Sequence, residues 1–247
     1  MVNDSALKAA SFLFKKAYFV YKPLYFQFKK IQDKSIIELC KSLVKPGDVI
    51  ADIGANIGFY SSIFSGLSGT KGHVYSFEPD KKNFQKLKKN ISGLSNCTIV
   101  NAAVGTSTEK LKFYTSHRLN VDHRTIEPEK FDAVMEVNCF SLDDYLKDKT
   151  RLDLIKMDIQ GAEMNALLGM KNILNSNKEL KIISELWPYS MIRSGYKTED
   201  LFTYLNGLGY SIRSIEPDGT KKQIILSDIK DRVEETFDLN IFISREN

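Results

Sequence analysis

The chain has little cysteine and no long apolar run, and each shortage excludes a class of protein. Its 247 residues include only Cys40, Cys97 and Cys139, which are widely spaced and form neither a zinc-ligand pattern nor a disulfide framework. We therefore expect a cytoplasmic protein, with the inner face of the membrane as a possible place of action. No apolar run approaches the roughly 18 residues of a membrane-spanning helix. Charged residues interrupt the N-terminal apolar stretch, which argues against a signal peptide.

Concentrated charge and phosphate-binding loops are also lacking. The net charge is only +4 and the lysines are spread along the chain, so we expect no nucleic-acid partner. The sequence contains neither the Gly-x-Gly-x-x-Gly turn of dinucleotide-binding proteins nor a Gly-x-x-x-x-Gly-Lys phosphate loop. These absences disfavour an NAD-dependent oxidoreductase. With 43% hydrophobic residues and no low-complexity linker, the chain is long enough for one large core.

What is present is a strand, a tight turn and a helix around two glycines. The apolar run Val49–Ile53 is typical of a strand buried on both faces, and Asp52, Gly54 and Gly58 follow the spacing Asp-x-Gly-x-x-x-Gly. Such a turn brings a ligand against bare backbone at a helix N-terminus, unless its glycines serve only packing. A carboxylate there favours a positively charged ligand with hydroxyl groups, and S-adenosylmethionine fits. We expect its contacts to include Asp52, Gly54, Ala55, Asn56, Gly58 and Phe59.

The next two predicted strands add further cofactor contacts. His73–Phe77 is the second strand, and it ends in Glu78 and Pro79. Doubly wound folds hold the two ribose hydroxyls with an acidic residue at this place, so we expect Glu78 to accept both. Small residues after the third strand would let an adenine ring lie against the backbone. The remaining expected contacts are Asn101, Ala102 and Ala103.

Two later strands end in carboxylates, Asp158 and Glu185. Because ligands of open α/β sheets bind at the carboxyl ends of the strands, we expect both side chains to converge there. Transfer to a hydroxyl needs a general base, and our candidates are Asp158, Glu185 and His123, with Glu163 in a secondary role. Alternatively, the two strand-end carboxylates hold Mg²⁺ or Ca²⁺. Ordinary structural roles in turns, ion pairs and loops are the remaining interpretation.

Three segments are candidates for contact with a substrate or a surface. The polar segment 116–125 lies between two strands that can pair as a hairpin, and it is interpreted as a substrate lid or a solvated excursion. Tyr189–Lys197 is a second candidate substrate loop. Residues 7–30 interleave aromatic residues with lysines, and Pro23 is expected to divide them into a helix and a second segment. They are either an interfacial membrane anchor or a helix packed on the domain with solvated lysines.

Five motifs in succession resemble one known family, the FkbM family of S-adenosylmethionine-dependent methyltransferases. The motifs are Asp52–Gly58, Phe77–Pro79, Asn101–Gly105, Lys156–Glu163 and Glu185–Pro188. The resemblance extends from about Val44 to the C-terminus and departs from the family pattern at Gln160, where an acidic residue is usual. That substitution puts any role of the acid in doubt here.

The resemblance implies an α/β fold with a Rossmann-like, seven-stranded, mostly parallel sheet of the class I methyltransferase type. It would comprise residues 44–247, preceded by a helical extension, residues 1–43. The implied activity is O-methylation of a hydroxyl on a sugar, glycan or glycolipid-type molecule, with no settled metal requirement. The alternatives are a nucleic-acid methyltransferase and a non-catalytic, membrane-associated module that only binds S-adenosylmethionine. The Asp/Asn/Ser-Pro-Pro-aromatic motif of exocyclic-amine methylases is absent.

Overall fold

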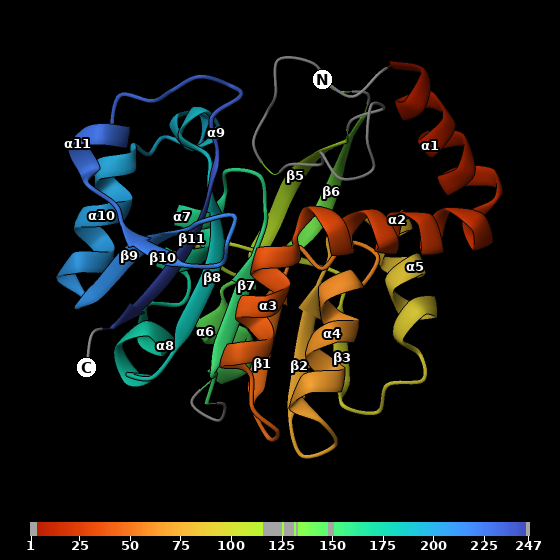
Figure 1. Ribbon diagram of the computed structural model, residues 1–247, viewed down its shortest axis with the longest axis horizontal. Coiled ribbons are helices and arrows are strands. Elements are labelled where there is room, and N and C mark those ends of the chain that lie inside the picture. The colour runs from red at the N-terminus through yellow and green to blue at the C-terminus, as the bar shows by residue number, and fades with distance from the viewer. Residues whose placement is uncertain (1–3, 116–124, 126–130, 132, 148–150, 246–247) are drawn as a thin grey trace.

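A central mixed sheet organises the molecule, which is a computed structural model describing residues 4–115, 125, 131, 133–147 and 151–245, with side chains from Lys8 onward (Figure 1). The strands lie in the order β10-β9-β11-β8-β7-β1-β2-β3. The five from β8 to β3 pair in parallel, whereas β11 runs antiparallel to both of its neighbours. Their bounds are β1 Val49–Ile53, β2 His73–Phe77, β3 Cys97–Val100, β7 Leu154–Met157, β8 Lys181–Leu186, β9 Tyr210–Ile215, β10 Lys221–Gln223 and β11 Leu239–Arg245.

The predicted class I methyltransferase architecture is confirmed, with one strand more than expected in the described sheet. The addition is β10, three exposed residues paired with β9 at the edge. Successive side chains of β1 point to opposite faces of the sheet, and because they are apolar on both sides, both faces of the sheet are covered. Ile50 packs in one core and Ala51 in the other.

Helices form a layer on each face. The core that contains Ile50 is covered by α3 (Lys34–Leu43) and α4 (Phe59–Ser68), beside which α5 (Lys81–Ile91) packs through its own small cluster. The opposite core is covered by α6 (Leu142–Leu146), α7 (Glu163–Leu168), α8 (Lys171–Ser176) and α10 (Thr198–Gly207). Two short helices, α9 (Pro188–Arg193) and α11 (Leu226–Ile229), complete the C-terminal half.

The predicted hairpin is present, but it belongs to a separate small sheet. Strand β5 (Glu109–Thr115) pairs antiparallel with β6 (Ala133–Phe140), and β4 (Ala103–Val104) adds to β6 in parallel. Phe113 and Cys139 are buried in its core. The hairpin rises beside the carboxyl ends of β1 and β2 (Figure 1).

Two helices form the N-terminal extension. They are α1 (Asp4–Lys16) and α2 (Tyr18–Gln32), and the break between them falls at Ala17. The expectation that Pro23 divides the segment is wrong: Pro23 lies inside α2, in its second turn, and the helix continues through it although its missing N–H removes one helical hydrogen bond. The extension packs on the domain, because the ring of Phe26 meets that of Phe59 edge-on at 5.2 Å. Within the described ranges, no helix is both long and apolar enough to cross a membrane.

Candidate functional site

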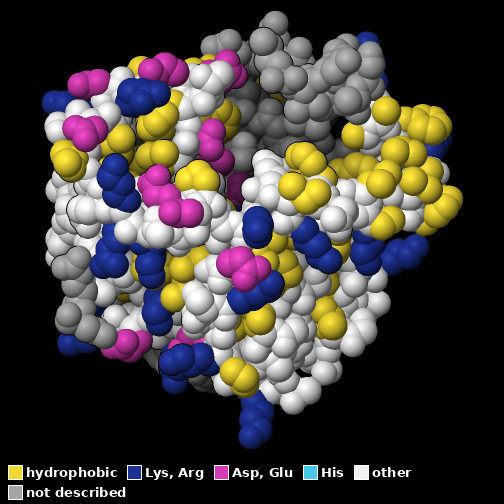
Figure 2. Space-filling model, in the orientation of Figure 1, with side chains coloured by type: hydrophobic (Ala, Val, Ile, Leu, Met, Phe, Trp, Pro, Cys, Tyr) yellow, Lys and Arg dark blue, Asp and Glu magenta, His cyan; other side chains and the backbone are white. Residues whose placement is uncertain are grey.

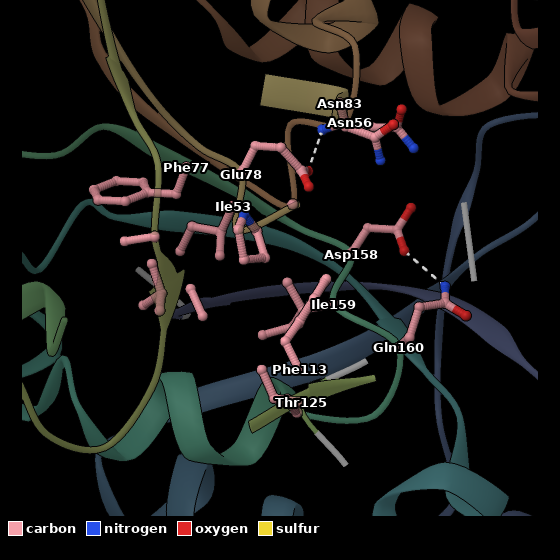
Figure 3. A pocket seen from close by; sticks show the side chains of 16 residues that line it. Ile53, Asn56, Phe77, Glu78, Asn83, Phe113, Thr125, Asp158, Ile159 and Gln160 are labelled. Carbon is pink, nitrogen blue, oxygen red and sulfur yellow. Dashed lines mark hydrogen bonds between the residues drawn. The ribbon is translucent and has the colours of Figure 1, made fainter. Parts of the chain in front are cut away.

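Two cavities meet at the carboxyl ends of β1, β2, β7 and β8. The narrow inner cavity, about 60 Å³, lies beside Glu78 and the β5 hairpin, whereas the outer cavity, about 580 Å³, opens toward α2. Gly54, Asn56, Asp158 and Gln160 line both cavities. Figure 3 shows these side chains around the inner cavity, with Glu78 on one side and Asp158 on the other. The turn after β1 and the turn after β7 therefore separate two adjoining binding spaces.

The glycine turn after β1 allows the backbone of a neighbouring turn to approach closely. Gly54 has φ +84°, and a Cβ placed there would come 2.1 Å from the backbone oxygen of Asp158. The amides of Gly54 and Ala55 both donate to Phe77 O, at 3.0 and 2.9 Å, which fixes the turn to β2. Asn56 follows with φ +50°, a conformation that asparagine tolerates better than most residues. Only glycine fits at the first of these positions.

Glu78 projects from the end of β2 into the inner cavity, as predicted. One carboxylate oxygen accepts from the backbone amide of Asn56 at 2.8 Å (Figure 3), and the other accepts from the backbone amide of Asp80, also at 2.8 Å. Burial raises its pKa to about 8, against the lowering effect of these two hydrogen bonds. In its ionised form each carboxylate oxygen has a second lone pair, so the group can then still accept hydroxyls from a ribose. Pro79 lines the cavity beside it.

The other predicted cofactor contacts divide between the two cavities and the supporting structure. Ala102 and Ala103 line the inner cavity, and Asp52, Ala55 and Phe59 line the outer one. Gly58 begins α4 in a left-handed conformation and lies against Leu87 of α5. Asn101 lines neither cavity: its side-chain amide donates to the backbone oxygens of Glu78 at 2.8 Å and Pro79 at 3.1 Å. It therefore braces the turn that carries the expected ribose contact.

Gln160 joins the two strand-end carboxyl groups. Its Nε2 donates to Asp158 Oδ1 at 3.0 Å and to Glu185 Oε2 at 3.2 Å. Its backbone adopts φ +58°, which is unusual for a residue other than glycine and is held here by Ser190 Oγ donating to Gln160 O at 2.7 Å. Strained backbone of this kind clusters at functional sites. The predicted convergence of Asp158 and Glu185 is thus present, with an amide between them.

Charge is divided unequally between these two carboxyl groups. Burial alone would raise the pKa of Asp158, but Lys156 and Lys29 hold it below its usual range. Burial raises the pKa of Glu185 to about 9, and the neighbouring charge of Asp158 adds to that rise. Lys156 Nζ lies 3.3 Å from Asp158 Oδ2 and 4.7 Å from the centre of the Tyr60 ring. At neutral pH, Asp158 is the ionised member of the pair and Glu185 the protonated one.

Two of the four predicted catalytic candidates are not placed at the cavities. Glu163 lines neither: one of its oxygens accepts from the amide of Ile159 at 3.1 Å, within the turn that presents Asp158. Burial raises its pKa to about 7. His123 and the candidate lid, apart from Thr125, lie outside the described residues; Thr125 lines the inner cavity. Most of the expected loop at 189–197 is instead helix α9, which lines neither cavity.

The carboxyl pair is a poor match for a divalent cation. Among the described residues, no three His, Cys, Asp or Glu side chains gather as ligands would. The space between Asp158 and Glu185 is taken by the N–H groups of Gln160, whereas Mg²⁺ and Ca²⁺ need oxygen ligands. These hydrogen bonds instead keep a proton on one of the two carboxyl groups, and no step of the reaction is assigned to a metal.

That a helix closes the outer cavity was not predicted from the sequence. Tyr25, Phe28, Lys29 and Gln32 of α2 line this cavity opposite the ends of β1 and β7. Lys29 is fixed there by an ion pair of 2.5 Å to Asp33, which also accepts from the hydroxyl of Tyr60 at 2.7 Å. Helical spacing could have identified the face of α2 that turns inward, but not the surface that receives it.

Other missed residues lie on strands or loops near predicted ones. Lys156 stands two residues before Asp158, and strand periodicity places the two on the same side of β7. Asn83 and Phe113 line the inner cavity, and Trp187 and Glu235 line the outer one. Trp187 belongs to the motif Glu185–Pro188, whereas nothing in the sequence pattern connects the other three residues to the site, because tertiary contacts alone bring them there.

The residues present fit S-adenosylmethionine. The turn at Gly54 leaves backbone bare, Glu78 can accept ribose hydroxyls, and the carboxylate of Asp158 stands where the two cavities join. Asp52, whose pKa burial raises to about 6, accepts from Ser61 Oγ at 2.6 Å and faces the outer cavity. Negative groups at this junction suit a sulfonium ion and an ammonium group.

Comparison with known proteins agrees with this site. A model of the methyltransferase FkbM domain matches residues 52–212. The chain is similar to the 2-O-methyltransferase NoeI of Sinorhizobium fredii, with 26% identity over 158 residues and coverage of 57% of this chain and 65% of the relative. It is also similar to the hexuronic acid methyltransferase AglP of Haloferax volcanii, with 28% identity over 149 residues and coverage of 58% and 59%. The chain thus spans less than two-thirds of either relative.

One solved structure extends the likeness to the fold. The methyltransferase FkbM from Methylobacillus flagellatus superposes with a TM-score of 0.51 and 20% identity, covering 84% of this chain and 50% of that one. At this identity the likeness establishes the fold alone. The part of this chain that precedes residue 52, including α2, lies outside the family match.

Proposed function

Because this chain belongs to the methyltransferase FkbM domain family, as its motifs predicted, we propose that it transfers a methyl group from S-adenosylmethionine to a hydroxyl of a sugar, glycan or glycolipid-type molecule. The observation that carries the proposal is the ionised carboxylate of Asp158 at the junction of a donor cavity and a larger acceptor cavity. The names of the two relatives, a 2-O-methyltransferase and a hexuronic acid methyltransferase, support an oxygen and a sugar as acceptors.

The donor would lie across the glycine turn. Its adenosine would lie at the inner cavity, which must widen to admit it, with the ribose hydroxyls donating to Glu78 and the adenine beside Ala102 and Ala103. Its methionine part would extend past Gly54 toward Asp52. When bound, this group supplies an electrophilic methyl on a positively charged sulfur. The protein's contribution is to align that methyl with an acceptor oxygen, and such alignment can supply much of the rate acceleration.

The acceptor proton sets the chemical requirement. If a sugar hydroxyl resembles water, with a pKa near 15.7, ionising it at pH 7 would cost about 12 kcal/mol. A base must therefore take the proton as the new C–O bond forms. Asp158 is ionised and lines the acceptor cavity, so we assign it this role. Glu185 is protonated and orients the acceptor or Gln160, and Glu163 positions the turn that carries Asp158.

Organisation and location are part of the same proposal. We divide the chain into an N-terminal extension, residues 1–43, whose last helix α3 packs into the domain core, and a methyltransferase domain, residues 44–247; α2 contributes the acceptor wall. The cysteines are free, two buried and one half-buried, which suits a reducing compartment such as the cytoplasm. A nucleic-acid acceptor is the alternative, and the mild net charge of +4 disfavours it.

Calorimetry and an acceptor screen test the proposal together. S-adenosylmethionine and S-adenosylhomocysteine should bind the full chain, whereas NAD should not. Release of S-adenosylhomocysteine should then be stimulated by neutral sugars, uronic acids or glycolipids, and not by RNA or DNA. Failure of both methionine-derived ligands to bind would overturn the donor site. Binding followed by transfer only to nucleic acid would overturn the acceptor class.

A further inference from the structure

The N-terminal helices carry an apolar surface that nothing in the described structure covers. Of the ten large hydrophobic residues that are exposed in the described ranges, five lie on α1 and α2. Phe19 is 82% exposed and Ile31 71%. We name the set the apolar face; its members are Phe12, Phe19, Leu24, Phe28 and Ile31. Figure 2 shows hydrophobic side chains gathered over this corner of the molecule, with lysine and arginine side chains along its lower edge.

Helical geometry separates Leu24, Phe28 and Ile31 of the apolar face from the packed side of α2, whereas Phe19 shares the stripe of Phe26 and is exposed where the helix begins. Leu24, Phe28 and Ile31 follow one another at the i, i+4, i+7 spacing of a single stripe. On the other side, Phe26 packs on Phe59, and Lys29 lines the outer cavity. The stripe is therefore exposed although the opposite side of α2 contacts the domain.

Charge identifies the partner. From residue 5 to residue 32 the chain has six lysines and no aspartate or glutamate. The next acid, Asp33, is buried and already bonded to Lys29 and Tyr60. Exposed lysines on the same two helices include Lys15, Lys16 and Lys30. Aromatic and aliphatic side chains framed by lysine suit the interface of a bilayer that contains anionic lipid.

A second copy of the chain fits the surface less well. A two-fold contact brings the same patch together from both subunits, so these lysines would face each other without acidic partners. Like charges opposed across an interface are unfavourable. The same reasoning does not apply to an anionic membrane.

The apolar face adjoins the outer cavity. Phe28 belongs to the face and also lines the cavity, with Tyr25 and Gln32 next to it on the inward side of α2. We propose that the apolar face docks on anionic bilayers and so sets the mouth of the acceptor cavity at the membrane surface, where it receives a glycan anchored to lipid. The docking does not depend on the proposed function, whereas the delivery of a lipid-anchored acceptor rests on it.

Vesicle flotation of the full chain tests the docking. The probes are vesicles of phosphatidylcholine alone and of phosphatidylcholine with roughly 30% phosphatidylglycerol. We expect binding to the anionic vesicles that weakens as salt screens the charges. Combined replacement Phe19→Ser, Leu24→Ser and Ile31→Ser should weaken it by at least about tenfold, because each removes apolar area from the interface. Lys15→Glu, Lys16→Glu and Lys30→Glu should do the same. Phe28 is left intact because it lines the cavity.

A matched variant controls for the loss of exposed apolar residues. Ile192, Ile225 and Val233 are exposed elsewhere, and changing all three to Ser should leave flotation unchanged. Melting temperature and calorimetric S-adenosylmethionine binding should be the same in every variant. Absence of flotation with anionic vesicles, or equal loss in the control variant, would overturn the docking. A stable dimer that Phe19→Ser, Leu24→Ser and Ile31→Ser dissociates would assign the face to a second copy instead.

The delivery step has a separate readout. The same sugars are offered free in solution and linked to a dialkyl lipid in anionic vesicles. For the anchored sugar, kcat/KM of the wild-type chain should be at least about tenfold higher than kcat/KM of the variant that combines Phe19→Ser, Leu24→Ser and Ile31→Ser. For the free sugar, the two proteins should have equal kcat/KM. Equal values of the two proteins on both forms would overturn delivery, even if flotation succeeds. Flotation without any methyl transfer to sugars would contradict the proposed function and leave the docking supported.

Discussion

Four residues at or beside the junction of the two cavities determine where a proton can rest. Lys156 keeps Asp158 ionised, and Gln160 shares its amide between that carboxylate and Glu185. The negative charge is therefore held by one group although two carboxyl groups are near each other. An acid at position 160 would add a third carboxyl group and remove the shared donor, so the amide is what permits the unequal division.

Amide substitutions distinguish the two carboxyl groups. Asp158→Asn removes the ionised base and should lower kcat by roughly 10²–10⁴-fold, the usual worth of general-base catalysis. Glu185→Gln replaces a protonated group by a neutral one of the same shape and should cost less than about tenfold at pH 7. Both effects are measured as the rate of single-turnover methyl transfer to the acceptor found in the screen. Calorimetry checks that each variant still binds the donor. The reverse order of effects would assign the base to Glu185.

At the scale of elements, the turn after β1 depends on the turn after β7. Gly54 touches the backbone of Asp158, and the amide of Asp158 donates to Ile53 O at 3.1 Å. Two parallel neighbouring strands thus bring their turns into contact. The turn after β1 provides the backbone that cradles the donor, and the turn after β7 carries the proposed base. A change in either turn should disturb the other.

Two glycine substitutions in neighbouring elements test this contact. Gly54→Ala forces a Cβ onto Asp158 O at a left-handed φ, which should cost at least about 2 kcal/mol of folding free energy and abolish detectable donor binding. Gly66→Ala lies in α4 with open space around it and should instead stabilise the protein by about 0.5–1 kcal/mol. Chemical denaturation and calorimetry measure the two effects. Normal donor affinity in Gly54→Ala would show that the turn does not form the cradle.

The elements that sequence could predict are those with a local cause. The apolar run of β1, the glycine spacing after it and the acid after β2 all act over a few residues, and the structure has them at the predicted positions. The place of α2 at the outer cavity had no such cause, since helical spacing identifies a face of the helix but not the surface that receives it. Gln160 was recognised as a departure, but its contact with Glu185 spans 25 residues of sequence and needed the fold.

At the scale of the whole molecule, several carboxyl groups are buried with raised pKa values. The values are about 7 for Glu163, about 8 for Glu78 and about 9 for Glu185, in each case mainly because of burial. Unfolding returns these groups to a pKa near 4.3. Between pH 5 and 9 the folded chain therefore binds more protons than the unfolded chain, and its stability falls as the pH rises.

The melting temperature of the protein without ligands should accordingly fall between about pH 6 and pH 9. One pKa unit at one group corresponds to about 1.4 kcal/mol, and for a chain of this size each kcal/mol moves the melting temperature by roughly 2–4 °C. We expect a fall of at least about 5 °C. Glu185→Gln should flatten the profile, because the amide does not titrate. A flat or rising wild-type profile would contradict the assigned protonation states.

The wall that α2 supplies has a consequence for how relatives of this chain can differ. The donor cradle and the base lie within residues 52–212, whereas Tyr25, Phe28, Lys29 and Gln32 precede that segment. Descendants of one ancestor could thus keep a common chemical centre and acquire new substrates by exchanging a helix at the start of the chain. Grafting this helix between relatives would then be a direct way to redirect the choice of substrate.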